Sequence, residues 1–185
     1  MSGDRTKFKY DSKLIYGLHS EGILEIKIHD PKKKNAFFHK TMLKLTEILT
    51  YANKEPKVKC VVVHGGKFFS AGNDLEAFQI GREDVDEVKH IANELLKTGL
   101  TKMLKTMYDL EKPLVMLARG FCIGLGFTML SLADFVYCSP ETKFFTPFMQ
   151  TYQSPEGGST AFFPKYFGPH LTSEILMTDR IVTAK

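Results

Sequence analysis

The spacing of apolar residues in the first third of the chain predicts a strand, a helix and a second strand. Residues 24–28 alternate apolar and charged side chains, which is the period of a half-buried strand. An Asp-Pro pair then breaks this pattern. Over residues 38–52 the apolar side chains recur at steps of three and four, as in an amphipathic helix that ends before Pro56. Residues 58–63 form an apolar run suited to a buried parallel strand, so a right-handed crossover is expected.

The rest of the chain continues the alternation of helices and strands. Apolar positions between residues 85 and 107 trace one long helix with a weak point at Gly99, and a Lys-Pro pair ends it. Five further elements are predicted: strands at 114–117 and 135–138, a turn into a helix over 119–133, and short helices at 159–167 and 171–177. We therefore expect one α/β domain over residues 1–185, with buried parallel strands.

Composition supports a domain with a sizeable core and argues against several classes of protein. Of the 185 residues 43% are hydrophobic, and the net charge of +4 is spread among acidic residues without a basic stripe. Nucleic acid is therefore not an expected partner, and no apolar run is long enough to span a membrane. The three cysteines and six histidines show no metal-ligand spacing, and the cysteines are expected to be buried free thiols. The lysines at 32–34 are the exception, since they could meet a phosphorylated ligand.

Two glycine-rich loops each follow a predicted strand. The first, "HGGKFFSAGNDL", covers residues 64–75, and the second, "GFCIGLGF", covers residues 120–127. Each could be an ordinary turn, the first capped by Asn73 or Asp74, and neither matches a dinucleotide-binding pattern. Loops at the carboxyl ends of neighbouring parallel strands can also converge. In that arrangement each would give one backbone N–H to a substrate oxygen and stabilise an enolate.

A single carboxylate, Glu156, lies in "QSPEGGST" between a proline and two glycines, within an aromatic-rich region. Poor solvation raises the pKa of a carboxylate and suits it to proton transfer near neutral pH. The alternative is an acid near a helix N-terminus that caps Gly158 or Ser159. These residues alone leave both interpretations open.

Four motifs in order, "DPKKKNAF", "FFSAGNDL", "GFCIGLGF" and "SPEGGST", resemble those of the crotonase (enoyl-CoA hydratase/isomerase) superfamily, and within it the Δ3,Δ2-enoyl-CoA isomerases. The resemblance spans nearly the whole chain. It implies a crotonase-like ββα spiral. Full-length relatives continue past the last residue here, so we expect a truncated domain that lacks the family's C-terminal helices.

The resemblance also implies the roles of individual residues. The N–H groups of Ala71 and Leu125 would form an oxyanion hole for the thioester carbonyl, and Glu156 would carry the proton. The residues implied to bind substrate or coenzyme A are Lys34, Ala36, Ser70, Ala71, Gly72, Asn73, Asp74, Leu75 and Gly124. No metal and no separate cofactor are expected, because coenzyme A is part of the fatty enoyl-CoA substrate.

The expected reaction follows from which acids the chain lacks. Family members that hydrate double bonds use two glutamates, and matching the motifs without gaps puts Thr128 and Phe148 at those positions. A lone base suffices to move a proton from C2 to C4 of a 3-enoyl thioester, so isomerisation is expected. The alternatives are a non-catalytic acyl-CoA-binding module and another crotonase reaction such as hydration. The resemblance further implies a homotrimer in the full-length form and a peroxisomal or mitochondrial location.

Overall fold

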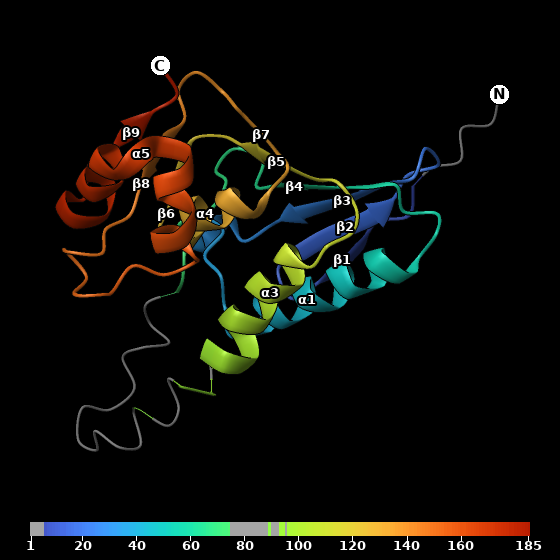
Figure 1. Ribbon diagram of the computed structural model, residues 1–185. Coiled ribbons are helices and arrows are strands. Elements are labelled where there is room, and N and C mark those ends of the chain that lie inside the picture. The colour runs from blue at the N-terminus through green and yellow to red at the C-terminus, as the bar shows by residue number, and fades with distance from the viewer. Residues whose placement is uncertain (1–5, 75–88, 90–92, 95) are drawn as a thin grey trace.

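The computed structural model describes residues 6–74, 89, 93–94 and 96–185, and two sheets organise them (Figure 1). The larger sheet has the order β1-β2-β3-β4-β5-β7, and the smaller one has the order β6-β8-β9. The strands of the larger sheet are β1 (Lys9–Asp11), β2 (Leu14–Leu18), β3 (Ile23–Ile28), β4 (Cys60–His64), β5 (Leu114–Ala118) and β7 (Phe135–Cys138). Those of the smaller sheet are β6 (Phe121–Ile123), β8 (Lys143–Phe145) and β9 (Val182–Thr183).

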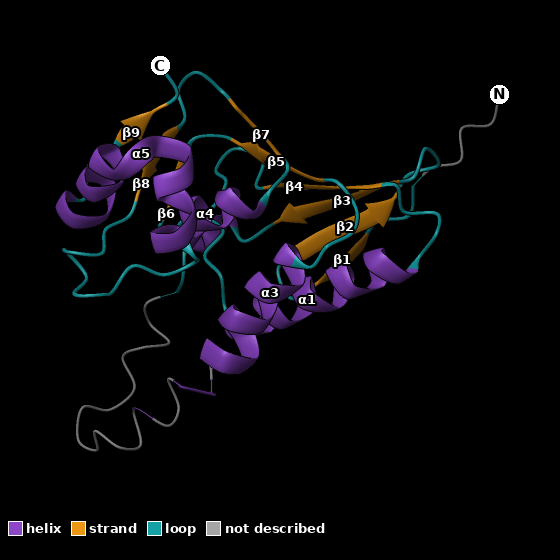
Figure 2. Ribbon diagram, viewed as in Figure 1, coloured by secondary structure: helices purple, strands orange, loops and turns teal. Residues whose placement is uncertain are grey.

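The larger sheet buries one face beneath two helices, α1 (His39–Lys54) and α3 (Lys102–Tyr108) (Figure 2). Strands β3, β4, β5 and β7 run parallel, whereas β1 and β2 are antiparallel additions at the edge. Alternate residues of β3 point into the core, as the period of two requires. The apolar stripe of α1 covers them.

Most of the predicted elements are confirmed, with small changes of bounds. Strands β3, β5 and β7 and helix α1 lie where the apolar pattern placed them, and β4 begins two residues later than expected. Strand β7 differs from the other parallel strands, because all four of its residues are exposed at the edge of the sheet. The three cysteines are free thiols as predicted, but the prediction that they are buried holds only for Cys122, since Cys60 is partly exposed and Cys138 is exposed.

The C-terminal half contains both a confirmed break and missed strands. Helix α5 (Ser159–Thr178) is interrupted at Gly168, where φ is 74° and ψ is 167°, so the prediction of two successive helices is confirmed. The predicted turn contains strand β6, which was not expected, and the predicted helix is the short α4 (Leu125–Thr128) followed by a 3₁₀ turn at Met129–Leu132. Strands β8 and β9 were not expected, and neither were β1 and β2 in the N-terminal half.

The predicted long helix over residues 85–107 lies partly outside the described residues. Its C-terminal part is a π-helical turn at Leu96–Thr101 followed by α3. Gly99 is buried in that π-helical turn, and a Cβ atom there would lie 2.6 Å from the His39 ring on α1. The change of helix type therefore coincides with the expected weak point.

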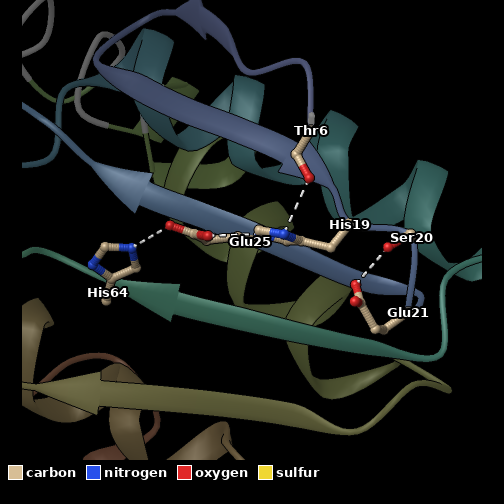
Figure 3. A network of polar contacts seen from close by, with 6 residues as sticks. All are labelled: Thr6, His19, Ser20, Glu21, Glu25 and His64. Atoms are coloured by element: carbon tan, nitrogen blue, oxygen red, sulfur yellow. Dashed lines mark hydrogen bonds and ion pairs between the residues drawn. The ribbon is translucent and has the colours of Figure 1, made fainter. Parts of the chain in front are cut away.

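A polar network ties the edge of the larger sheet to its centre (Figure 3). On β3, the carboxylate of Glu25 accepts hydrogen bonds from Nε2 of His19, at 2.8 Å, and from Nε2 of His64, at 3.0 Å. Burial raises the pKa of Glu25, but the two histidine hydrogen bonds outweigh burial and lower it. The stability that this network contributes is therefore present at neutral pH and lost as the pH falls below the ordinary range of a glutamate.

Candidate active site

The first glycine-rich loop is fastened to strand β6, which leads into the second. Ser70 donates its backbone N–H to the carbonyl of Phe121, at 3.2 Å, and accepts from the N–H of Ile123, at 3.0 Å. An added Cβ atom on Gly72 would lie 2.6 Å from the carbonyl oxygen of Ile123 and 3.4 Å from the nitrogen of Leu125. The predicted convergence of the two loops is therefore observed, and glycine is required where they touch.

Asn35, which the sequence did not single out, holds the other side of the first loop. Its side-chain nitrogen donates to the carbonyl oxygens of Gly65 and Phe68, at 2.9 and 2.7 Å, and its side-chain oxygen accepts from the N–H of Asp30. Asn35 has a φ of 60°, which asparagine tolerates better than most residues. The hydrogen bonds to Gly65 and Phe68 make Asn35 a structural tether for the loop.

The N–H of Ala71 is already bonded, which corrects the expectation that it is free for a ligand. It donates to the carbonyl of Lys34 at 3.0 Å. The backbone N–H without a partner is two residues further on, at Asn73. Phe37 exchanges hydrogen bonds with the carbonyl of Gly72 and the N–H of Asp74, so the extended backbone directs the N–H of Asn73 away from Phe37. Among the described residues, this N–H has no partner.

The second loop contains Leu125, whose N–H is the other donor that the family resemblance predicts. Gly124, with φ of 50° and ψ of −121°, uses its own N–H to bond the carbonyl of Phe145 at 3.0 Å. Leu125 is the first residue of α4, so its N–H has no partner within the helix. The N–H groups of Leu125 and Asn73 are thus two backbone donors that have no partner among the described residues and lie where the loops meet.

Glu156 faces the same cavity as these two donors. The cavity has a volume of about 50 Å³ and is lined by Ala71, Gly72, Asn73, Ile123, Gly124, Leu125, Pro147, Phe148, Thr151, Gln153 and Glu156. Oε1 of Glu156 accepts a hydrogen bond from Oγ1 of Thr128 at 3.1 Å, and Oε2 is buried without a partner. Burial raises the pKa of Glu156 from its ordinary 4.5 to about 7, while the Thr128 hydrogen bond opposes the rise.

The alternative role for Glu156, a cap of the following helix, does not fit the structure. Helix α5 has Gly158 at its N-cap, and no side chain caps its first N–H groups. The backbone carbonyl of Glu156, not its carboxylate, accepts from the N–H of Ser159. The carboxylate is therefore available for chemistry in the cavity.

At the two positions where hydrating family members are expected to carry glutamates, this chain has Phe148 and Thr128. Phe148 lines the cavity and is almost fully buried, and the buried Thr128 contacts Glu156 directly. Neither side chain can act as a second acid. The cavity lining contains no titratable group other than Glu156 among the described residues.

The remaining predicted binding residues divide into lining, supporting and peripheral positions. Gly72 and Gly124 line the cavity, whereas Ser70 is buried beside it and donates its hydroxyl to the carbonyl of Asn35. Asp74 is buried behind the loop, and Leu75 lies outside the described residues.

The predicted coenzyme A segment borders the first loop. A 3₁₀ turn, Pro31–Lys33, precedes it, and Lys34 follows in a left-handed conformation with its side chain exposed. Ala36 is buried. Within the described residues, no cluster of histidine, cysteine or acidic side chains could hold a metal ion, and no helix has the length and apolarity needed to cross a bilayer.

Comparison with known proteins agrees with this geometry. The family model described as Enoyl-CoA hydratase/isomerase matches residues 19–185. The chain belongs to this family. It is 32% identical over 175 residues to enoyl-CoA delta isomerase 3, peroxisomal, of Mus musculus, covering 95% of the chain and 54% of that relative. It is also 32% identical over 166 residues to carnitinyl-CoA dehydratase of Citrobacter koseri, covering 88% of the chain and 60% of that relative.

Solved structures of the family share the fold. The crystal structure of enoyl-CoA hydratase/isomerase from Pseudoalteromonas atlantica superposes with a TM-score of 0.79 at 28% identity, covering 94% of this chain and 64% of that one. The crotonase-like α/β fold expected from the four motifs is therefore confirmed. The chain spans about half the length of the curated isomerase relatives that it matches.

Proposed function

We propose that this member of the enoyl-CoA hydratase/isomerase family is an enoyl-CoA delta isomerase, which moves a 3-enoyl-CoA double bond to the trans-2 position. The observation that carries the proposal is the carboxylate of Glu156, whose Oε2 is buried without a hydrogen-bond partner. Its unpartnered Oε2 shares a cavity with two free backbone donors, and among the described residues no second acid lines that cavity. The same arrangement would serve the oxidation of unsaturated fatty acids.

In the proposed reaction Glu156 first acts as a base. Oε2 takes a proton from C2 of the 3-enoyl thioester, and the electrons of the C–H bond move toward the thioester oxygen to give a dienolate. The N–H groups of Leu125 and Asn73 would hold that oxygen, each supplying roughly 2.7–4 kcal/mol. Oε2 then returns the proton to C4, and the double bond forms between C2 and C3.

The pKa of Glu156 supports both steps. At a pKa of about 7 the carboxylate is substantially ionised at neutral pH and can also hold the proton long enough to return it. Turnover should therefore fall as the pH drops below about 7, because the base becomes protonated before substrate binds.

Other parts of the proposal extend to the whole substrate and the assembly. The exposed Lys34 would meet the phosphates of coenzyme A and the buried Ala36 would border its adenine or pantetheine. Ser70 and Asp74 would act by supporting the first loop. We also propose a homotrimer for the full-length protein and a peroxisomal or mitochondrial location, in line with the peroxisomal isomerase relative.

The test is a Glu156→Gln variant assayed with two substrates. Conversion of 3-enoyl-CoA is followed by the absorbance of the conjugated thioester, and hydration of 2-enoyl-CoA by its loss. We expect isomerisation by the wild type and a fall of about 10²–10⁴-fold in the variant, with acyl-CoA binding retained. Binding without conversion by the wild type would favour the non-catalytic module. Hydration, the reaction class suggested by the dehydratase relative, would be favoured if the wild type consumed 2-enoyl-CoA instead.

A further inference from the structure

Thr128 makes the one hydrogen bond that the carboxylate of Glu156 has among the described residues. Thr128 is fully buried on α4, next to the backbone donor of Leu125. Its Oγ1 is 3.1 Å from Oε1 of Glu156 and 3.5 Å from the carbonyl of Leu125. The carboxylate oxygen is the nearer of these two acceptors and, when ionised, the stronger one, so the hydroxyl proton points toward Glu156.

The backbone next to Glu156 is also shaped around Thr128. Gly157 has a φ of 67°, and a Cβ atom on it would lie 2.1 Å from Oγ1 and 2.6 Å from Cβ of Thr128. The turn that carries Glu156 therefore lies directly on this threonine. Both the side chain and the main chain of the turn depend on the shape and the hydroxyl of Thr128.

We propose that Thr128 is a positioning residue that fixes Oε1 of Glu156 and so makes Oε2 the only proton-carrying oxygen of the site. The inference rests on the proposed function. When Glu156 is ionised, Oε1 accepts from the hydroxyl as a carboxylate oxygen. When Oε2 carries the substrate proton, Oε1 is the carbonyl oxygen of the acid and still accepts. The hydrogen bond thus persists through both proton transfers, and the same oxygen faces C2 and then C4.

The hydroxyl should also adjust the acidity of Glu156. Burial raises the pKa of this group and the Thr128 hydrogen bond lowers it, and no charged group among the described residues contributes to the shift. Removing the hydroxyl should leave burial unopposed and move the acid limb of the pH profile upward. A residue that only filled space would not move that limb.

The experiment compares Thr128→Val, which removes the hydroxyl at nearly constant volume, with Thr128→Ser, which keeps it. For Thr128→Val we expect the acid limb of kcat to move up by about one pH unit and kcat at pH 7 to fall about fivefold, with little change in KM. Thr128→Ser should retain the wild-type limb. Thr46→Val is the matched control, because it removes another buried threonine hydroxyl, bonded to the carbonyl of Met42 on α1.

A second readout does not depend on turnover. Infrared difference titration of each protein against the same protein carrying Glu156→Gln reports the pKa of the Glu156 carboxyl. An unchanged titration and pH limb in Thr128→Val would overturn the inference, and Thr128→Ala replaces it if the valine variant does not fold. Full activity of Glu156→Gln would instead overturn the proposed function. An inactive Glu156→Gln with an unperturbed Thr128→Val would overturn the positioning role alone.

Discussion

Gly72 lies where the two glycine-rich loops touch, and replacing it with alanine should damage activity more than its cost in stability suggests. Its φ of 87° is strained for alanine, at about 1–2 kcal/mol. The new Cβ would also lie 2.6 Å from the carbonyl oxygen of Ile123, whereas ordinary contact begins at 3.4 Å. The loops must therefore separate by about 0.8 Å, and such overpacking typically costs about 1–3 kcal/mol.

That displacement acts on the proposed oxyanion hole. Asn73 follows Gly72 directly and Leu125 is on the other loop, so the two N–H donors move apart. A shift near 1 Å in a catalytic arrangement can reduce the rate by about 10²-fold. For Gly72→Ala we expect an unfolding free energy lower by about 2–5 kcal/mol and a loss of isomerase activity near 10²-fold, measured by denaturant unfolding and by the conjugated-thioester assay.

Gly66→Ala is the matched control for this experiment. Gly66 has a similar φ of 73°, but the atoms nearest to its added Cβ belong to the flexible end of Lys27, at 3.4 and 3.9 Å. It should incur only the backbone strain and keep its activity. If Gly72→Ala and Gly66→Ala retained equal turnover, the reasoning that the loops must touch at Gly72 would be refuted.

Two further variants test stability at the same site. Because the pKa of Glu156 is about 7 in the folded protein and about 4.5 in the unfolded chain, the folded state binds more protons between these values and stability falls as the pH rises. Glu156→Gln should therefore raise the unfolding free energy by up to about 3 kcal/mol above pH 7 and by little below pH 4.5. Urea titrations at several pH values would measure this difference. An equal effect in both pH ranges would contradict the raised pKa of Glu156. Asn35→Asp puts a carboxylate against buried carbonyl oxygens and should lower the unfolding free energy by about 3 kcal/mol, measured by thermal or urea unfolding. The control Asn53→Asp, whose amide hydrogen bond is exposed, should lower it by about 1 kcal/mol or less. Equal losses would contradict the role of Asn35 as a tether.

Local patterns were sufficient for the elements whose signal lies within a few residues. The alternation in β3, the period of α1 and the Gly-Pro break in α5 each follow from neighbouring side chains. The missed hairpin of β1 and β2 turns on Ser12 and Lys13, both with positive φ, instead of the Asn-Gly or Asp-Gly that usually marks such a turn. Its sequence therefore gave no turn signal.

Long-range pairing explains the other differences. The three-residue strand β6 is defined by its parallel partner β8, about twenty residues later, and no local pattern predicts that contact. The choice between Ala71 and Asn73 as backbone donor likewise depends on which N–H the carbonyl of Lys34 accepts from. Its sequence context made Glu156 a candidate, but its bond to Thr128 could be seen only in the fold.

The hydrogen bonds between residues 34–37 and the first loop connect the two ends of the proposed substrate mechanically. The N–H of Ala71 bonds the carbonyl of Lys34, the hydroxyl of Ser70 bonds that of Asn35, and the N–H of Phe37 bonds that of Gly72. Residues 34–37, which would bind the nucleotide part of coenzyme A, are therefore fixed relative to the loop that would bind the thioester carbonyl. Binding energy from the nucleotide part of the substrate could therefore help to align the reacting carbons. Thioesters of carriers shorter than coenzyme A would then have a lower kcat.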